Sequence, residues 1–151
     1  MKILSIDPAT KCGWATNSPR TCGVWDLSVK SDESDGMRLI RFESKLSEFC
    51  LTNAPKLITF ERPGGKFTKP IMTQSEIIGT LKAFCIKHKI EYRAYSSTEI
   101  KKHATGKGNA NKQAMIDAAK DKLSYAGNND NEADALWLLN LTENDYCRKN
   151  D

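Results

Sequence analysis

The stretch KILSIDPATKCGWA, residues 2–15, opens the chain and decides its fold. Residues 2–7 alternate weakly between apolar and polar and are rich in Ile and Leu, which predicts a strand that ends on the carboxylate of Asp7. Residues 12–16 and 22–28 are two further strand-like segments, and the turn sequence NSPR separates them. Together the three segments predict a meander of adjacent antiparallel strands.

Helical and strand patterns alternate after this meander. Apolar side chains recur at helical spacing from Met37 to about residue 52, and the sequence Asn53-Ala54-Pro55 ends that helix. The other expected elements are strands over residues 56–61 and 90–95 and helices over 72–89, from the capping box Ser96–Glu99, over 112–124 and from an N-cap at Asn129. These patterns predict a single α/β domain over residues 1–151, a mixed five-stranded sheet with helices on both faces and a polar tail that frays from about residue 143.

The composition is that of an ordinary globular protein, with 39% apolar and 28% charged residues. A net charge of +4 permits an anionic partner without requiring one. Five cysteines without a CxxC pair predict reduced thiols, not a disulfide framework or a zinc site. No stretch approaches the roughly 20 apolar residues of a membrane helix, and the short N-terminal apolar run is no signal peptide. We therefore expect a cytoplasmic protein with no membrane partner.

Acidic residues occur at three places that this topology can bring together. Asp7 closes the first strand, Glu61 closes a later strand, and Asp134 lies in the first turns of the last helix. If the two strands are parallel neighbours, their terminal carboxylates lie side by side at the sheet edge where α/β sheets gather ligands. Asp130 lies four residues before Asp134 and Asn131 three residues before it, so either can share a helix face with Asp134.

Clustered carboxylates repel one another, so such a site needs a cation. Oxygen ligands suit Mg²⁺ or Mn²⁺ better than zinc. Two such ions about 4 Å apart would clamp the attacking and leaving oxygens of a phosphodiester displacement. Asp7 and the helix-start acids also have ordinary structural explanations, because Asp before Pro commonly caps a turn and acids are favoured at helix N-termini. Glu61, at the end of an apolar strand, is harder to explain in this way. The prediction of a metal site therefore rests on the combination of the acids.

Four motifs, in order along the chain, resemble those of the RuvC family of Holliday-junction resolvases, members of the RNase H-like superfamily. They are ILSIDPATKCGWA at residues 3–15, LITFERP at 57–63, YSSTEIKKHATGKGNANKQAM at 95–115 and NEADALWLL at 131–139. The resemblance spans nearly the whole chain. It implies an RNase H-like fold, a homodimer to which the helix at 72–89 contributes, and Mg²⁺-dependent nicking of symmetrically related strands at a four-way DNA junction.

The resemblance also implies particular metal ligands. Three of the family's four metal-binding positions fall on acids, namely Asp7, Glu61 and Asp134. The fourth falls on Asn131, where the family usually has an acid or a His. Asn131 can still offer a carbonyl oxygen, and Asp130 or Glu132 could substitute for it if the helix start shifts slightly. Two Mg²⁺ ions per site, or Mn²⁺ in their place, are the expected cofactors.

Two basic loops are expected to contact the branched DNA. The loop at residues 62–70 carries Arg62, Lys66 and Lys69, together with Phe67, which could stack on unpaired bases as an aromatic residue of the family does near the junction centre. In the loop at residues 105–112, Lys107 and Lys112 lie beside or soon after glycines, which suits phosphate contacts. Lys112 also matches a family lysine that assists catalysis by neutralising charge.

Other functions and origins stay open at this point. The short length and the RPGGK insert look more like the phage or viral branch of the family, which would place the protein inside a host cell. Asn131 keeps open a branched-DNA-binding protein with weak or no cleavage. A third possibility is another RNase H-like nuclease that acts on RNA. The cleavage preference and the stringency for four-way junctions are not encoded in any recognisable motif.

Overall fold

The computed structural model describes residues 1–64 and 69–150. Its elements are β1 (Ile3–Asp7), β2 (Lys11–Asn17), β3 (Arg20–Asp26), α1 (Met37–Asn53), β4 (Leu57–Glu61), α2 (Lys69–His88), β5 (Glu91–Tyr95), α3 (Ser97–Thr105), α4 (Lys112–Lys122) and α5 (Asp130–Asn150). The strands form one sheet in the order β3-β2-β1-β4-β5. The β1–β2 and β2–β3 pairs are antiparallel, whereas β1–β4 and β4–β5 are parallel. The predicted meander and mixed five-stranded sheet are therefore confirmed.

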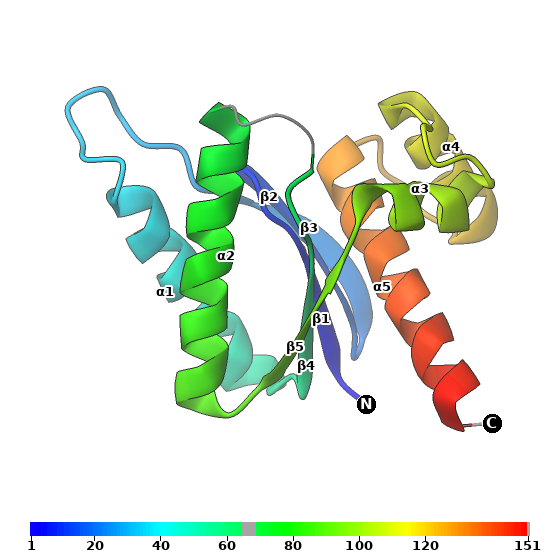
Figure 1. The fold of residues 1–151 in the computed structure, drawn as a ribbon, viewed down its shortest axis with the longest axis horizontal. Helices are drawn as coiled ribbons and strands as arrows, with labels where there is room; N and C mark the ends of the chain where they lie inside the picture. Colours follow the sequence, from blue (N-terminus) through cyan, green and yellow to red (C-terminus); the bar gives the residue numbers. More distant parts are fainter. Residues whose placement is uncertain (65–68, 151) are drawn as a thin grey trace.

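Helices cover both faces of this sheet, as predicted (Figure 1). Helices α1 and α2 pack on one face, and α5 crosses the other with α3 and α4 beside it. Along β1, Leu4 and Ile6 are buried against α1 and α2, whereas Ile3 is buried against α5. Because side chains alternate between the faces of a strand, Asp7 points to the same face as Ile3, toward α5.

The register between β1 and β4 brings the two strand-terminal acids together. Ile3 pairs with Leu57, and each following residue of β1 pairs with the next residue of β4 as far as Ile6 and Phe60. The same register continued by one residue places Asp7 beside Glu61. Both carboxylates therefore lie at the carboxyl end of the parallel strands, on the face that α5 covers.

A line of buried hydroxyl groups lies beneath these acids. Ser5 Oγ and Thr59 Oγ1 are 2.7 Å apart, and Thr142 of α5 donates a hydrogen bond to Thr59 Oγ1 over 3.2 Å. All three side chains are fully buried and come from β1, β4 and α5. Because buried hydroxyls need partners, these hydrogen bonds join the three elements at one level in the core.

Local capping signals set the starts of two helices as predicted. At α3, the Glu99 N–H donates to Ser96 Oγ over 3.1 Å, and the Ser96 N–H donates to Glu99 Oε2 over 2.7 Å, which completes the capping box. At α5, the Glu132 N–H donates to Asn129 Oδ1 over 3.0 Å. The side chain of Asn129 therefore caps the helix that carries Asp134.

Helix α2 begins at Lys69, three residues earlier than the sequence pattern predicts. Pro70 is its second residue, and proline suits the first turn of a helix because its missing N–H has no intrahelical acceptor there. Helix α2 therefore begins close to the loop that follows Glu61. Within residues 1–64 and 69–150, no helix combines the length and the apolar character needed to cross a membrane.

The polar segment from Glu143 differs from the expected frayed tail, because it continues α5 to Asn150. Glu143 accepts a hydrogen bond from Arg20 of β3 over 2.6 Å. The Tyr95 hydroxyl at the end of β5 donates to Asp145 over 2.9 Å. These contacts fasten the last turns of α5 to both edge strands of the sheet, which explains why a polar sequence remains helical.

Candidate active site

A cavity of about 430 Å³ opens at the carboxyl ends of β1 and β4. The acids that line it are Asp7, Glu61, Asp130 and Asp134, and the amide of Asn131 lies among them. The parallel register positions the first two acids, and the capped start of α5 supplies the others from above. The structure thus brings every acid predicted for the site, and Asn131, into one cavity.

Burial and mutual repulsion shape the ionisation of the two strand-terminal acids. Burial raises the pKa of Asp7 well above its ordinary value, and the charges of Glu61, Asp134 and Asp130 and a hydrogen bond with Glu61 raise it further. Burial also raises the pKa of Glu61, although a hydrogen bond with Ser97, the charge of Lys101 and the hydrogen bond with Asp7 oppose this rise. Burial thus opposes the ionisation of both acids, and for Asp7 the charges of the neighbouring acids oppose it further.

The pKa of Asp134, the third acid, is raised for similar reasons. Burial and then the charges of Glu61 and Asp130 raise the pKa of Asp134 to about 7, against the opposing charges of Lys101 and Lys112. Concentrated negative charge of this kind is what a bound cation relieves.

The donor set of this cavity suits a hard divalent cation. Carboxylate oxygens and the amide oxygen of Asn131 are ligands that Mg²⁺ and Mn²⁺ prefer, and no thiol or imidazole lines the cavity among the described residues. Among residues 1–64 and 69–150, no three His, Cys, Asp or Glu side chains already form a compact metal-binding group. The acids thus have the chemistry that the cation prefers. Their side chains line a cavity, but they do not form a closed coordination shell.

Two lysines bring positive charge to the same cavity. Lys112, predicted as a catalytic residue, is the first residue of α4, and its Nζ lies 3.4 Å from the carboxylate of Asp130. Its side chain is 83% exposed, so it can also reach a bound anion. Lys101 of α3 lines the cavity as well, and its charge acts on both Glu61 and Asp134.

Sequence reasoning did not assign to the site four polar residues that line the cavity, namely Gln74, Ser97, Lys101 and Asn111. Ser97 and Lys101 are four residues apart on α3 and therefore share one helix face. That spacing, directly after a strand that ends at the site, is a signal that could have identified both. No comparable signal marks Gln74, because its place depends on how α2 passes over the sheet.

Of the described residues predicted to contact DNA, Lys112 lines this cavity, whereas Arg62, Lys69 and Lys107 do not. Lys69 lines a neighbouring cavity of about 380 Å³ together with Lys11 and Asn131. Arg62 and Lys107 are exposed and line neither cavity. Lys66 and Phe67 lie outside the described residues. Contact with DNA stays a prediction for these five residues, Arg62, Lys66, Phe67, Lys69 and Lys107.

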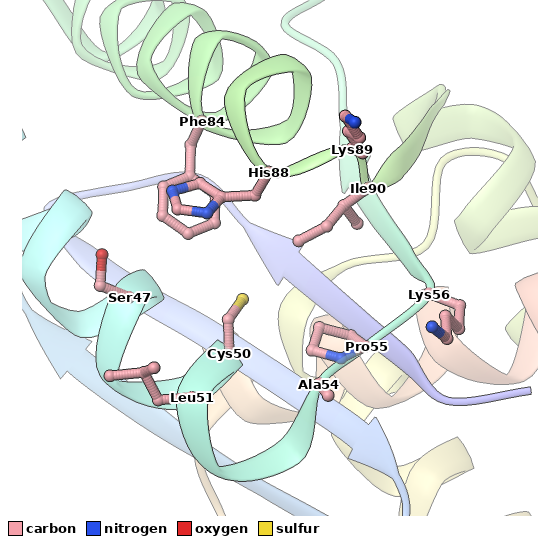
Figure 2. Close-up of a pocket in the computed structure, with 10 residues that line it drawn as sticks. All are labelled: Ser47, Cys50, Leu51, Ala54, Pro55, Lys56, Phe84, His88, Lys89 and Ile90. Carbon is pink, nitrogen blue, oxygen red and sulfur yellow. The ribbon is translucent and has the colours of Figure 1, made fainter.

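A further cavity of about 450 Å³ lies at the other end of the sheet, where β4 and β5 begin (Figure 2). Cys50 and Leu51 of α1 face Phe84 and His88 of α2 across it, and the rings of Phe84 and His88 stack with centroids 4.2 Å apart. Lys56 and Lys89 add positive charge, and no described carboxylate lines the cavity. Among the described residues, this cavity therefore lacks the carboxylate oxygens that a divalent cation prefers as ligands.

Three curated proteins that are similar in sequence to this chain share one name, crossover junction endodeoxyribonuclease RuvC. No protein-family model matches the chain. The crossover junction endodeoxyribonuclease RuvC of Brachyspira hyodysenteriae is 28% identical over 151 residues, which cover 91% of this chain and 91% of that protein. The RuvC of Rickettsia rickettsii is 28% identical over 150 residues, 91% of this chain and 94% of that protein. The RuvC of Mycobacterium ulcerans is 24% identical and covers 93% and 80%.

Solved structures agree with this relationship. Thermus thermophilus RuvC superposes with a TM-score of 0.71 at 17% identity, and each chain is covered to about nine tenths, 91% and 90%. RuvC of the same organism in complex with a Holliday junction substrate gives a TM-score of 0.74 at 18% identity and the same coverage. The sheet order and the helices on both faces therefore define a protein of the RNase H-like fold class. Within that class the chain is similar to RuvC proteins in sequence and in fold. These sequence relatives are bacterial, and the phage or viral origin stays a prediction.

Proposed function

We propose that this chain is a metal-dependent endonuclease that nicks four-way or other branched DNA by hydrolysing phosphodiester bonds. The observation that carries the proposal is the convergence of Asp7, Glu61 and Asp134 on one cavity in a RuvC-like chain. RuvC relatives are crossover junction endodeoxyribonucleases. The raised pKa values of the three acids support a site built to be neutralised by cations.

In this proposal the acids at the strand ends and the start of α5 hold two Mg²⁺ or Mn²⁺ ions. When bound, the ions would supply an activated water and stabilise the leaving oxygen. Ser97 lines the cavity beside Glu61, and its hydroxyl group would stabilise the ionised carboxylate, whose pKa it lowers. Lys101 and Lys112 would offset negative charge around the scissile phosphate.

Asn131 is the proposed fourth ligand position, with its carbonyl oxygen as donor. Asp130 lies in the same cavity, but its carboxylate is paired with Lys112 at 3.4 Å. We assign Asp130 to the orientation of Lys112, and Glu132 to the helix start, where its carboxylate accepts a hydrogen bond from Tyr125 over 3.2 Å. A neutral amide is a weaker ligand than a carboxylate, so we expect the site to need a higher metal concentration than a four-acid site.

The proposed macromolecular partners are branched DNA and a second copy of the chain. Lys69 at the start of α2, Lys107 and Arg62 are exposed and would contact phosphates. Lys66 and Phe67 are proposed contacts near the branch point. Paired nicks on symmetrically related strands require two active sites, which a two-fold dimer supplies. Helix α2 is the proposed dimer contact, since it leaves Met72 44% and Ile86 71% exposed.

The test compares four labelled substrates: a four-way junction, a flap, a linear duplex and an RNA–DNA hybrid. We expect Mg²⁺- or Mn²⁺-dependent paired nicks near the branch point of the junction and none in the duplex. The Asp7→Asn variant should bind the junction but not cut it, and the Asp121→Asn variant, which changes an exposed acid of α4, should cut it normally. Junction binding without cuts in either metal would favour a DNA-binding protein, and preferential cutting of the hybrid would favour an RNA-directed nuclease.

A further inference from the structure

Gly13 of β2 occupies a position where no side chain fits. A Cβ atom at this residue would lie 2.1 Å from the backbone oxygen of Asn131 and 2.6 Å from its carbonyl carbon. Both distances are far shorter than any non-bonded contact that a real Cβ makes. The backbone of α5 therefore touches the sheet directly at Gly13, and a peptide group cannot rotate out of the way as the end of a flexible side chain can.

This contact lies next to the first metal-binding acid. Gly13 and Asp7 are directly paired residues of β2 and β1, so they project to the same face of the sheet. Asn131 belongs to the first turn of α5, and Asp134 follows it by about one turn. The height of that first turn above β2 consequently sets how far Asn131 and Asp134 stand from Asp7.

The rest of α5 is held by other contacts. Ala15, two residues after Gly13 on the same face, is fully buried together with Ala135 and Leu139 of α5. These small and apolar contacts anchor the second and third turns of the helix against the sheet. A side chain at position 13 would therefore lift the first turn while the later turns stay in place, which moves Asn131 and Asp134 but leaves the fold intact.

Contacts on the far side of the first turn do not set this height. The Tyr125 hydroxyl lies 3.3 Å from the backbone oxygen of Asn129, to which it donates, and the Asn129 side chain caps Glu132. These hydrogen bonds fix the shape of the helix start from the loop side. The Cys22 thiol of β3 also donates a hydrogen bond to Glu132 Oε2 over 3.4 Å. None of these hydrogen bonds reaches β1 or β2, the strands that carry Asp7 and Gly13.

We propose that Gly13 is a positioning residue of the metal site: by lacking a side chain, it seats the first turn of α5 on β2 and sets the distance of Asn131 and Asp134 from Asp7. This inference rests on the proposed function, because it assigns Gly13 a role toward the divalent cations of that site. Gly13 itself contacts neither the cations nor the DNA.

The experiment compares the full-length wild type with Gly13→Ala and a matched control, Gly23→Ala. Gly23 is also a strand glycine, but a Cβ there would meet the ring of Trp14 at 2.7 Å, which is a side chain, and not α5. Three quantities are measured: Mn²⁺ affinity by electron paramagnetic resonance of free Mn²⁺, hydrogen exchange of the amides at residues 131–134, and binding of a four-way junction in the presence of a chelator.

We expect Gly13→Ala to unfold cooperatively and to bind the junction without metal as the wild type does. Its Mn²⁺ affinity should fall about 10- to 100-fold, the range seen when a residue that orients metal ligands is changed. The amides at residues 131–134 should exchange faster, and Gly23→Ala should match the wild type in both measurements. A change confined to stability, with unaltered Mn²⁺ affinity, would not fit a positioning role.

Two failures are distinguishable. If the wild type binds Mn²⁺ and Gly13→Ala binds it equally well, or if Gly23→Ala loses as much affinity, the inference about Gly13 is overturned and the proposed function stands. If the wild type itself binds no Mn²⁺ and cuts no substrate, the proposed function is overturned, and the metal role of Gly13 with it.

Discussion

Replacing Asp134 by Asn should stabilise the metal-free protein at neutral pH although it removes a residue of the site. Burial and neighbouring acids raise the pKa of Asp134 from 3.8 to about 7 in the folded protein. Between these values the folded state binds more protons than the unfolded chain, so the free energy of unfolding falls as the pH rises through this window. Above pH 7 the loss of unfolding free energy caused by Asp134 has reached its full size. An Asn side chain does not ionise, so it causes no such loss.

The size of this effect follows from the two pKa values. Each pH unit contributes about 1.4 kcal/mol, so a rise from 3.8 to about 7 sets a ceiling of about 4 kcal/mol on the destabilisation by Asp134. Because the side chain keeps some contact with water, we expect about 2 kcal/mol. The Asn variant should therefore exceed the wild type in unfolding free energy by about 2 kcal/mol at pH 8 and by much less at pH 5.

Urea unfolding followed by tryptophan fluorescence, with a chelator present at both pH values, measures this difference. Asp121→Asn on α4, which changes an exposed acid, serves as the control and should follow the wild type. Added Mg²⁺ should stabilise the wild type more than the Asp134→Asn variant, because a ligand that binds only the folded state raises its stability. A variant that is less stable than the wild type at pH 8, or that keeps the same pH dependence, would refute the reasoning.

Three further predictions address the fold and the DNA contact. Ser96→Ala removes the oxygen that caps α3 and should lower the unfolding free energy by about 1 kcal/mol in urea titrations, whereas an unchanged value would mean that the cap is dispensable. Leu46→Ala empties a fully buried position of α1 and should cost about 2–5 kcal/mol in the same assay, and a smaller loss would mean that the core closes over it. Lys107→Ala should weaken junction binding and reduce by about 1 the slope of log affinity against log salt concentration, and an unaltered slope would exclude a phosphate contact.

Local patterns carried the prediction of the acids at the strand ends. The sequence predicted strands over residues 2–7 and 56–61 that end on Asp7 and Glu61, and parallel pairing of these strands makes the two carboxylates neighbours. The start of α5 was also predictable, because Asn129 and Glu132 have the spacing of an N-cap and its partner. These residues share a property: their roles depend on neighbours within a few positions or on strand register.

Residues whose roles depend on tertiary packing were not predictable in this way. Gln74 enters the cavity only because α2 crosses the sheet end at a particular height. Gly13 has an ordinary strand context in the sequence, and its requirement appears only when α5 passes over it. The helical tail from Glu143 is mostly polar, and it is held by contacts that a local pattern does not identify. They are the hydrogen bonds with Arg20 and Tyr95 and the contacts of Tyr146 with Glu91 and Arg93.

The buried hydroxyls of Ser5, Thr59 and Thr142 bear on how the site responds to its ligands. They couple β1, β4 and α5 directly below the acids that those same elements carry. The conformational entropy of gathering three distant chain segments is therefore lost during folding and not at the moment of ion or substrate binding. Binding of ions or substrate then requires only rotations about side-chain bonds. A mutation that removes one of these three hydroxyl groups should therefore weaken ligand affinity, although none of them contacts a ligand.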